Sequence, residues 1–553
     1  PSIFVSYTGE TLDKKSPVLK SMKALDMQAK RILKLFGINC KKVTTTVGPE
    51  QEYFLISEEE YFKRIDLRMT GRTLFGAPVL RGQELEDHYF GTIKPSISEF
   101  MADLDQTLWS FGIPSKTRHN EVAPAQHEMA PIFATTNVAI DENMLTMELM
   151  KKVAQKHGLI CLLHEKPFEG INGSGKHNNW SMATDDGLNL LDPGENPEKN
   201  TLFMLVLAAV IKAVDDYQGI LRGAVASAGN DHRLGANEAP PAIISVYLGD
   251  QLGALVDSIA SGKDYVPFRA KEGSIGVPES PIFPKDASDR NRTSPFAFTG
   301  NKFEFRMLGS QANVADANIV LNTIIAEAFA EFADELEGVD DLEAAARALI
   351  TKTIKAHSRI IFNLDGYGPA WEPEAERRGL LNNKDTADAT EVFFEKKNID
   401  VFVNQGVYTE EEAVARAMVR LENYVKIINI EAVTMLKMAK QDIMPAVSDY
   451  VAELCSNVAA KKAISEHIPC EAEKALITKL SALNDAFAVE VAKLEKILGG
   501  IDKEDVRPAS KAMAHEVLPQ MAAVRKIADE METLTAEDYW PYPSYTDLLY
   551  SVK

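Results

Sequence analysis

Apolar and polar residues alternate in short runs in the first part of the chain, which is typical of strands. In residues 44–56, β-branched and aromatic side chains predict a strand, and Glu50 and Glu52 would then project from the same face. Two carboxylates side by side repel each other unless a cation lies between them. A solvated strand face explains an isolated pair of this kind equally well, so the pair alone does not predict a cation site.

Residues 302–306 alternate charged side chains with phenylalanine. On a strand, Lys302, Glu304 and Arg306 share one face while the two phenylalanines face a core. The charged face lines either a site or solvent, because salt-bridge ladders on a protein surface have the same pattern.

Helical periodicity dominates elsewhere. The most apolar run, residues 202–211, is too short to cross a bilayer and predicts a buried helix. Apolar residues recur at three- and four-residue steps over 476–498, which predicts an amphipathic helix ended by Gly499. We expect this helix to pack within the chain, with an oligomer contact as the alternative. The tyrosine-rich tail, residues 539–550, is expected to dock on a surface.

Two carboxylates flank an interrupted apolar segment at residues 119–130. Pro124 argues against a continuous helix or a central strand there. An extended strand with a bulge would bring Glu121 and Glu128 towards one cavity, whereas a loop would leave both carboxylates in water. The segment by itself slightly favours the loop.

A polar, glycine-containing segment at residues 172–181 surrounds His177 with short polar side chains. Glycines let backbone N–H groups approach an anion, and an imidazole can bind a cation that the anion shares, so phosphate with its metal is the ligand that fits. Gly170, Gly175 and Lys176 match the start of a P-loop, but His177 stands where that motif needs Ser or Thr. A surface loop without a ligand is the alternative, and it would be preferred if this segment stood alone.

Five ordered fragments together resemble glutamine synthetase, most closely its long type III class, over about residues 1–420. They are Gly-Pro-Glu-Gln-Glu-Tyr-Phe from Gly48, Asn-Glu-Val-Ala-Pro-Ala-Gln-His-Glu from Asn120, Asn-Gly-Ser-Gly-Lys-His-Asn-Asn from Asn172, Arg-Asn-Arg from Arg290 and Phe-Glu-Phe-Arg from Phe303. The resemblance implies an α+β fold, in which the glutamine-synthetase-like catalytic domain has a curved, largely antiparallel sheet flanked by helices. We place this catalytic domain at residues 1–410. Beyond it, Ala, Glu, Lys and Leu dominate and predict a helical C-terminal region at residues 411–553.

The resemblance also implies two metal sites. One ion would be held by Glu52, Glu121 and Glu128, and the other by Glu50, His177 and Glu304. Carboxylate-rich sites suit Mg2+ or Mn2+, which also bind phosphate oxygens, whereas a zinc site would be expected to use more His or Cys. The four cysteines of the chain lie outside these fragments.

The implied reaction is a two-step ligation. The side-chain carboxylate of glutamate attacks the γ-phosphoryl of ATP, and ammonia then displaces phosphate from γ-glutamyl phosphate, giving glutamine, ADP and phosphate. Arg292 and Arg306 would act on the phosphoryl group, while Glu238 would close the site and help to take a proton from ammonium. Two further sets would contact the substrates: Asn172, Gly173, Arg233 and Arg306 the glutamate, and Asn179, Ser181 and Lys302 the nucleotide.

Three features depart from the family pattern. The spacing from Arg233 to Glu238 is one residue shorter than in the better-known classes. A nucleotide-side arginine, expected five residues after Arg292, falls on Ala297, so either Arg290 or another group replaces it or nucleotide binding differs here. The chain opens at Pro1 without a counterpart of the family's small N-terminal β-domain, which contributes an aspartate to the neighbouring subunit's site, and we interpret the chain as truncated.

Composition limits the partners. The chain has 553 residues, 45% of them apolar, so it can bury a large core and we expect more than one domain. A formal net charge of −21 argues against nucleic acid and anionic membranes. Four scattered cysteines without a visible secretory leader favour the cytoplasm. The expected partners are glutamate, ammonium and ATP, and the resemblance implies a homo-oligomer, a dodecamer of stacked rings.

The predicted function is therefore ATP-dependent synthesis of glutamine by a glutamate–ammonia ligase. Two alternatives stay open: a related carboxylate–amine ligase that uses a larger amine, and a non-catalytic structural relative. The full set of six metal-binding side chains argues against the second, because a silent protein has no physical need for so many clustered acids.

Overall fold

The computed structural model describes residues 3–237, 239–263, 265, 272–273, 283–284 and 293–552. Two predicted catalytic residues, Glu238 and Arg292, lie outside the described residues, as does Arg290.

Two open sheets form the centre of the molecule. The six-stranded sheet has the order β5-β1-β7-β12-β11-β8, and the four-stranded sheet has the order β3-β4-β2-β6. Every strand pair in them is antiparallel except β11 with β8. The strands are β1 (Val43–Pro49), β2 (Gln51–Ser57), β3 (Ser115–Asn120), β4 (Gln126–Pro131), β5 (Ala134–Thr135), β6 (Leu159–Leu162), β7 (Gly175–Thr184), β8 (Val246–Tyr247), β11 (Phe296–Phe298) and β12 (Phe303–Gly309), with a separate pair of β9 (Glu272–Gly273) and β10 (Phe283–Pro284).

The single strand expected over residues 44–56 is divided at Glu50. β1 before it belongs to the six-stranded sheet, and β2 after it belongs to the four-stranded sheet. The predicted antiparallel character is confirmed, but the strands form two sheets that share this continuous stretch of chain.

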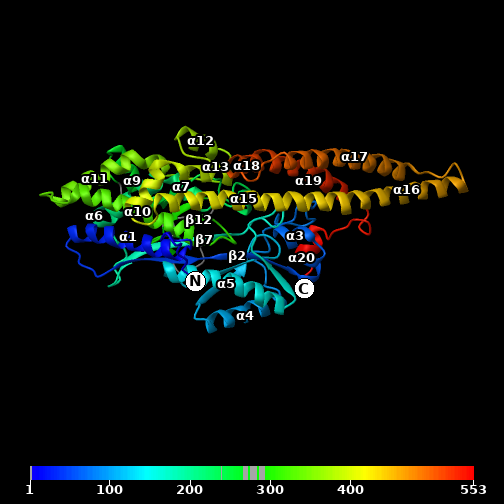
Figure 1. Cartoon of the computed structure of the whole chain (residues 1–553). Helices are drawn as coiled ribbons and strands as arrows, with labels where there is room; N and C mark the ends of the chain where they lie inside the picture. Colours follow the sequence, from blue (N-terminus) through cyan, green and yellow to red (C-terminus); the bar gives the residue numbers. More distant parts are fainter. Residues whose placement is uncertain are drawn as a thin grey trace.

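Helices cover the six-stranded sheet. α1 (Lys15–Leu35), α6 (Thr201–Asp216), α10 (Ala315–Leu336) and α11 (Leu342–His357) pack together and share one apolar core with the inner side chains of β1, β7 and β12 (Figure 1). α6 contains the run at residues 202–211 and is buried along its length, as predicted. The α+β fold class is therefore confirmed.

The four-stranded sheet is covered on both faces. α4 (Pro95–Ser110) and α5 (Thr136–Lys156) share a core with one face of it. The other face packs against α20 (Tyr545–Tyr550), the last helix of the chain. The prediction that the tyrosine-rich tail docks on a surface is therefore confirmed.

Shorter helices complete the body: α2 (Glu58–Phe62), α3 (Ile65–Thr70), α7 (Gln218–Ala224), α8 (Ala228–Arg233), α9 (Gly249–Ser261), α12 (Trp371–Arg377), α13 (Thr386–Glu391) and α14 (Lys396–Asn404). Among the described residues, no helix combines the length and the apolar character that crossing a bilayer requires.

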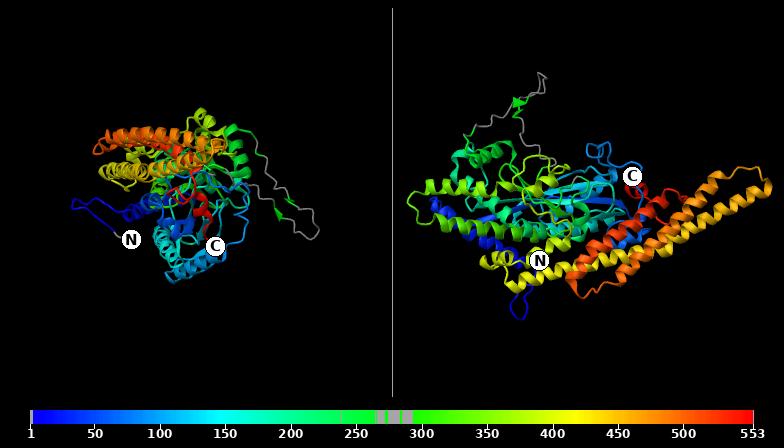
Figure 2. Two further views of the ribbon diagram at one scale, coloured as in Figure 1. Left: turned by 90° about the vertical axis from the view of Figure 1, so that its right-hand side faces the viewer. Right: turned by 90° about the horizontal axis from the view of Figure 1, so that it is seen from above.

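The C-terminal region is helical. It consists of α15 (Glu410–Met438), α16 (Met444–Ile464), α17 (Glu471–Gly499), α18 (Val506–Ala512) and α19 (Leu518–Glu532). α16 and α17 form an antiparallel pair that projects from the body (Figures 1 and 2). The apolar positions of α17 are buried against neighbouring helices, so the intramolecular packing predicted for residues 476–498 is confirmed.

Two π-helical turns interrupt the α-helices of this region next to prolines. Residues 439–443 precede Pro445, and residues 513–517 precede Pro519. A proline lacks the N–H that would bond to the preceding turn, and its ring crowds that turn's carbonyl. A wider turn accommodates both effects, so the chain remains helical on both sides of Pro445.

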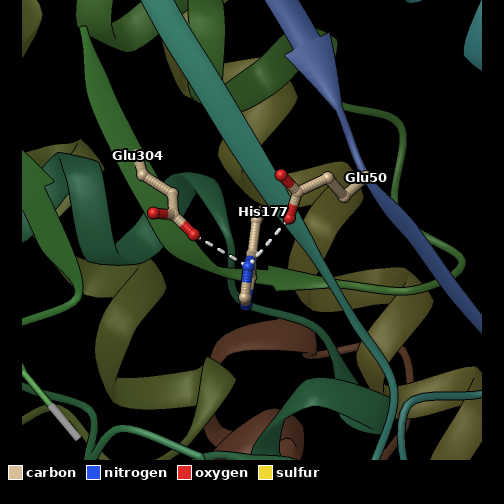
Figure 3. A group of neighbouring side chains, drawn as sticks. All are labelled: Glu50, His177 and Glu304. Atoms are coloured by element: carbon tan, nitrogen blue, oxygen red, sulfur yellow. Dashed lines mark ion pairs between the residues drawn. The ribbon is translucent and has the colours of Figure 1, made fainter. Parts of the chain in front are cut away.

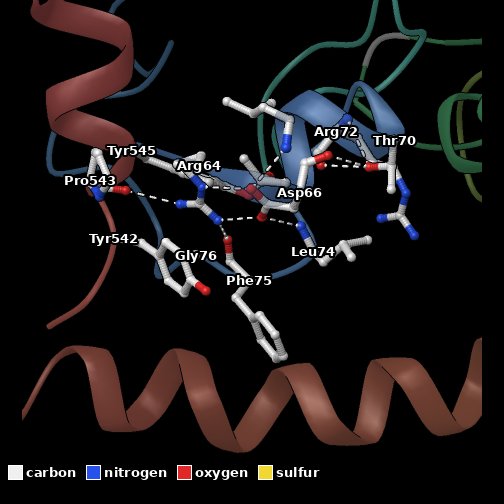
Figure 4. A network of polar contacts seen from close by, with 12 residues as sticks. Arg64, Asp66, Thr70, Arg72, Leu74, Phe75, Gly76, Tyr542, Pro543 and Tyr545 are labelled. Atoms are coloured by element: carbon white, nitrogen blue, oxygen red, sulfur yellow. Dashed lines mark hydrogen bonds and ion pairs between the residues drawn. The ribbon is translucent and has the colours of Figure 1, made fainter. Parts of the chain in front are cut away.

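A buried arginine ties the tail to the catalytic part. Arg64, 1% exposed, pairs with Asp66 at 2.6 Å and donates to the carbonyl oxygens of Pro543 at 2.9 Å and Phe75 at 2.6 Å (Figure 4). Its guanidinium also lies 5.5 Å from the ring centroid of Tyr542. This network holds the segment that leads into α20 against the four-stranded sheet.

Candidate active site

A cavity of about 600 Å³ lies where the two sheets meet. All six predicted metal-binding residues line it, and so do Asn172, Gly173, Arg233 and Arg306 from the predicted glutamate set. These ten residues come from five widely separated segments of the chain that converge on one space.

β7 positions the central side chains by simple alternation. Lys176, Asn178, Trp180 and Met182 are buried, while His177, Asn179 and Ser181 face the opposite side and are partly exposed. Glu304 on β12 pairs in register with Asn179, which brings the Glu304 carboxylate beside the His177 ring. The charged face predicted for residues 302–306 therefore lines the site.

Glu50, His177 and Glu304 form the first cluster (Figure 3). The Nδ1 atom of His177 lies 3.0 Å from a carboxylate oxygen of Glu50 and 2.8 Å from one of Glu304. Although burial opposes it, hydrogen bonds to the two carboxylates raise the pKa of His177 well above its usual value. A positive charge between two carboxylates is the arrangement that a metal cation would also satisfy.

His119, Glu121 and Glu128 form the second cluster. The Nε2 atom of His119 lies 3.1 Å from Glu128, and its Nδ1 atom lies 3.6 Å from Glu121. Burial, followed by the charges of Glu52 and Glu128, raises the pKa of Glu121 to about 8. Glu52 also lines the cavity, where its carboxylate accepts a hydrogen bond from the backbone N–H of Gly175 at 2.7 Å.

The donor atoms of both clusters fit hard divalent cations. In each cluster, one atom from every residue lies within 4.8 Å of the others, and carboxylate oxygens outnumber imidazole nitrogens. Burial and the neighbouring carboxylates favour the protonated form of Glu121, and a bound cation would favour the ionised form.

The bulged strand, one of the two alternatives considered around Pro124, does not form. β3 and β4 are a hairpin in which His119 pairs with Glu128, and Glu121 lies in the connection. Ala125 in this connection has φ 61°, a turn conformation that the sequence pattern did not indicate. Glu121 and Glu128 nevertheless reach one cavity, so the solvent-exposed loop that the pattern slightly favoured is excluded.

Arg233 at the end of α8 lies against the two glycines of the 172–175 segment. It donates to the carbonyl oxygens of Leu308 at 3.2 Å and Arg306 at 3.3 Å. A Cβ atom on Gly175 would overlap the Arg233 guanidinium, and one on Gly173 would overlap the carbonyl oxygen of Glu165. Gly175 therefore allows the Arg233 guanidinium to approach closely, and Gly173 allows the Glu165 backbone to do so.

Arg306 is held beside the first cluster. Its guanidinium donates to Thr293 at 3.0 Å and to Glu304 at 3.3 Å. Its aromatic neighbour in the cavity wall is Tyr367, a residue that the sequence motifs did not indicate.

Two of the three residues predicted to bind the nucleotide, Asn179 and Lys302, are hydrogen-bonded to each other beside the first cluster. Asn179 donates to Glu50 at 2.9 Å and accepts from the Lys302 ammonium, while Ser181 donates to the carbonyl oxygen of Asn301 at 2.8 Å. Ala297 is fully buried on β11 opposite Glu304. The nucleotide roles stay predictions.

Gln83 is a further contact that the motifs did not indicate. It donates to the Asn172 side chain at 2.7 Å and accepts from the Asn172 backbone N–H at 2.8 Å. Gln83, His119 and Tyr367 come from outside the predicted set because their roles depend on long-range packing and not on local spacing.

The position of the Lys176 side chain, which points into the core, excludes the partial P-loop match. This residue lies on a strand, is fully buried, and its ammonium donates to the carbonyl oxygen of Ala312 and to the sulfur of Met147. A P-loop lysine would instead face the ligand at the start of a helix.

Replacing Lys176 with methionine is expected to leave the KM for ATP within about twofold, since the amine points into the core. Burial lowers the pKa of Lys176 from its ordinary 10.5 to about 7. Between these values the unfolded chain binds a proton that the folded chain does not, so the unfolding free energy of the parent protein rises with pH relative to Lys176→Met. Urea unfolding of both proteins between pH 7 and pH 10 measures this difference. A tenfold change in the KM for ATP would contradict the assignment of Lys176 to the core.

The tail reaches the glycine-containing loop through one hydroxyl group. Tyr545, 1% exposed, contacts Thr73 Oγ1 at 2.6 Å, accepts from Arg525 at 2.6 Å and accepts from the backbone N–H of Glu169 at 3.0 Å. Glu169 directly precedes the loop that carries Asn172. Tyr545 therefore holds the start of this loop.

Tyr545→Phe is expected to lower the unfolding free energy by about 1–3 kcal/mol, because the Glu169 N–H and the Arg525 guanidinium lose a buried acceptor. We also expect a higher KM for glutamate with an unchanged KM for ATP, since only the loop end is released. Urea unfolding and initial rates measure these effects. Tyr7→Phe, in which the hydroxyl is fully exposed, is the control, and equal glutamate KM values in the two variants would contradict the positioning role.

Comparison with known proteins agrees with this geometry. Residues 28–245 match the glutamine synthetase catalytic domain, and residues 345–462 match the glutamine synthetase C-terminal domain. A glutamine synthetase of Butyrivibrio fibrisolvens is 46% identical, in an alignment that covers 100% of this chain and 79% of the relative. A type-3 glutamine synthetase of Dictyostelium discoideum is 41% identical over 100% of this chain and 76% of the relative, and a glutamine synthetase of Bacteroides fragilis is 42% identical over 100% and 77%. The chain therefore belongs to the glutamine synthetase family, in its type III class.

Proposed function

We propose that this cavity is where the chain joins ammonia to the side-chain carboxylate of glutamate, with ATP as the phosphoryl donor. The observation that supports this most is the pair of carboxylate clusters in one cavity with Arg233 and Arg306, on a chain of the glutamine synthetase family. The products are glutamine, ADP and phosphate.

The proposed metal ions are Mg2+ or Mn2+. Glu50, His177 and Glu304 would hold one ion, and Glu52, Glu121 and Glu128 would hold the other. His119, which groups with Glu121 and Glu128, is a further candidate ligand of the second ion. When bound, such ions neutralise phosphate oxygens and stabilise charge on the transferred phosphoryl group.

Arg233 and Arg306 have different proposed roles. The planar fork of Arg233 suits the α-carboxylate of glutamate, and the backbone carbonyls that it contacts fix its orientation. Arg306, held by Thr293 and Glu304, is placed to donate to the phosphoryl group. Arg292 and Glu238 keep their proposed roles in phosphoryl transfer and in site closure.

Asn179, Ser181 and Lys302 are proposed to contact the nucleotide, because they extend from the first cluster along the same face of β7 and the start of β12. Asn172 and Gly173 are proposed to contact glutamate with Arg233, since these three residues line the same cavity.

The assembly and the location are also proposals. Family membership supports a homo-oligomer, a dodecamer of stacked rings, working in the cytoplasm without nucleic acid or membrane partners. We assign catalysis to residues 1–410 and a supporting role to the helical region at 411–553. Light scattering of the purified protein measures the oligomer.

Phosphate release with components left out in turn tests the function. We expect release to require ATP, Mg2+, glutamate and ammonium together. Release that needs glutamate but not ammonium would contradict ammonia as the acceptor, and no release under any condition would favour a non-catalytic relative.

A further inference from the structure

A second cavity, of about 690 Å³, lies between α15, the segment around residues 393–408 and the N-terminal residues 10–14. It shares no lining residue with the active-site cavity. Its volume lies within the range of small-molecule sites, which is about 300–1,000 Å³.

The walls of this cavity are largely apolar, and two of the four acids among its lining residues, Asp316 and Glu412, are paired within the protein. Phe393, Phe402 and Tyr408 supply aromatic surface. Asp316 pairs with Lys14 and lies 3.7 Å from an Arg420 nitrogen. Glu412, also in the wall, accepts hydrogen bonds from the backbone N–H and the hydroxyl group of Thr11 at 2.5 and 2.8 Å.

Two atoms in the cavity wall, the Nε of Arg416 and the hydroxyl oxygen of Tyr424, have no hydrogen-bond partner among the described residues. Arg416 donates to the carbonyl oxygens of Thr11 and Asp13 and lies 4.9 Å over the Tyr408 ring, but within the described residues no carboxylate pairs with it and its buried Nε has no acceptor. Tyr424 is 1% exposed, and its hydroxyl group also lacks a partner. Leaving a buried donor without an acceptor costs free energy. A ligand that supplies the acceptor therefore recovers this free energy when it binds.

The spacing of these groups defines the ligand. Arg416, Arg420 and Tyr424 follow one another at successive turns on one face of α15, so Arg416 and Tyr424 are about 12 Å apart along the helix axis. We propose that this cavity binds an elongated organic anion, with its acidic group at Arg416, its apolar or aromatic body between the rings, and a hydrogen-bonding end at Tyr424.

The cavity is linked to the active site through α8. Ala228 lines the cavity at the start of this helix, and Arg233 lines the active site at its end. Thr386, another lining residue, donates to the Asp231 carboxylate within the same helix at 2.7 and 2.9 Å. A ligand that moves these residues therefore changes the position of Arg233, and we expect it to change the KM for glutamate.

Binding of 8-anilinonaphthalene-1-sulfonate, an aromatic anion of suitable length, tests the proposal by fluorescence titration of the full chain. We expect one saturable site per chain, and an affinity at least about tenfold lower in Arg416→Met, which removes the charge but keeps the length of the side chain. Ala415→Trp, at an exposed position of the cavity wall, should block the site without disturbing the core. Arg347→Met, on the exposed face of α11, is the matched control and should bind as the parent does.

Absence of a saturable site, or equal binding by the parent, Arg416→Met and Ala415→Trp, would overturn the proposal. Saturating probe should also change the KM for glutamate at least about twofold in the parent but not in Ala415→Trp. An unchanged KM with the site filled would overturn the link through α8. Because the titration needs no turnover, its result is independent of whether the proposed ligation is correct.

Discussion

Glu304→Ala is expected to reduce turnover at least about 10³-fold, which corresponds to about 4 kcal/mol of transition-state stabilisation, while the assembly stays intact. Glu304 contacts both His177 at 2.8 Å and Arg306 at 3.3 Å, so its loss removes a proposed metal ligand and the partner that orients an arginine. Initial rates of phosphate release measure the effect, and light scattering measures the assembly.

Glu374→Ala is the matched control for this variant. Glu374 also pairs with arginines, Arg377 and Arg378, but it lies on α12 and does not line the cavity. We expect it to keep near-normal turnover. Near-normal turnover of Glu304→Ala would contradict the assignment of the first cluster to a metal ion.

Gly175→Ala is expected to lower kcat/KM for glutamate about 100-fold with little change in stability, because small displacements of a binding group have effects of this size. The added methyl group would occupy the space of the Arg233 guanidinium, which is the flexible end of a side chain and can move. The protein therefore stays folded, but the arginine leaves the position proposed for carboxylate binding. Steady-state kinetics with varied glutamate and thermal unfolding measure the two effects.

For Gly173→Ala we expect the reverse of this result, with the main effect on stability. Its methyl group would overlap a backbone oxygen of Glu165, which cannot move without shifting the chain. We expect a loss of about 1–3 kcal/mol in unfolding free energy, as for overpacked cores. Gly499→Ala, where nothing lies within 4 Å of the new atom, should behave as the parent protein does. Normal glutamate kinetics in Gly175→Ala would contradict the role of Arg233.

Local periodicity was enough to predict several elements of the fold. The apolar run of α6 and the three- and four-residue spacing along α17 are properties of single helices, and both helices are buried where the pattern indicated. The alternation at residues 302–306 likewise predicted that Phe303 and Phe305 on β12 belong to the apolar core. These predictions succeeded because each depends only on the geometry of one element.

The division of the sheet and the full composition of the site depend on longer-range contacts. Glu50 and Glu52 are two residues apart, yet the chain passes from one sheet to the other between them, and no strand pattern marks that change. Tyr545 contacts Thr73 from 472 positions along the chain, so the link from the tail to the glycine-containing loop could not be found from spacing. The six metal residues were identified by resemblance to a family, and the cavity brings those six together.

The most direct test of the central claim is incorporation of isotope-labelled ammonium by the purified full-length protein with ATP, Mg2+ and glutamate, followed by chromatography and mass analysis of the product. The cavity geometry and the family membership predict label in the side-chain amide of glutamine, with one ADP formed per glutamine. Absence of labelled glutamine, or exclusive use of a larger amine when both are offered, would contradict the assignment of glutamine synthesis to this chain.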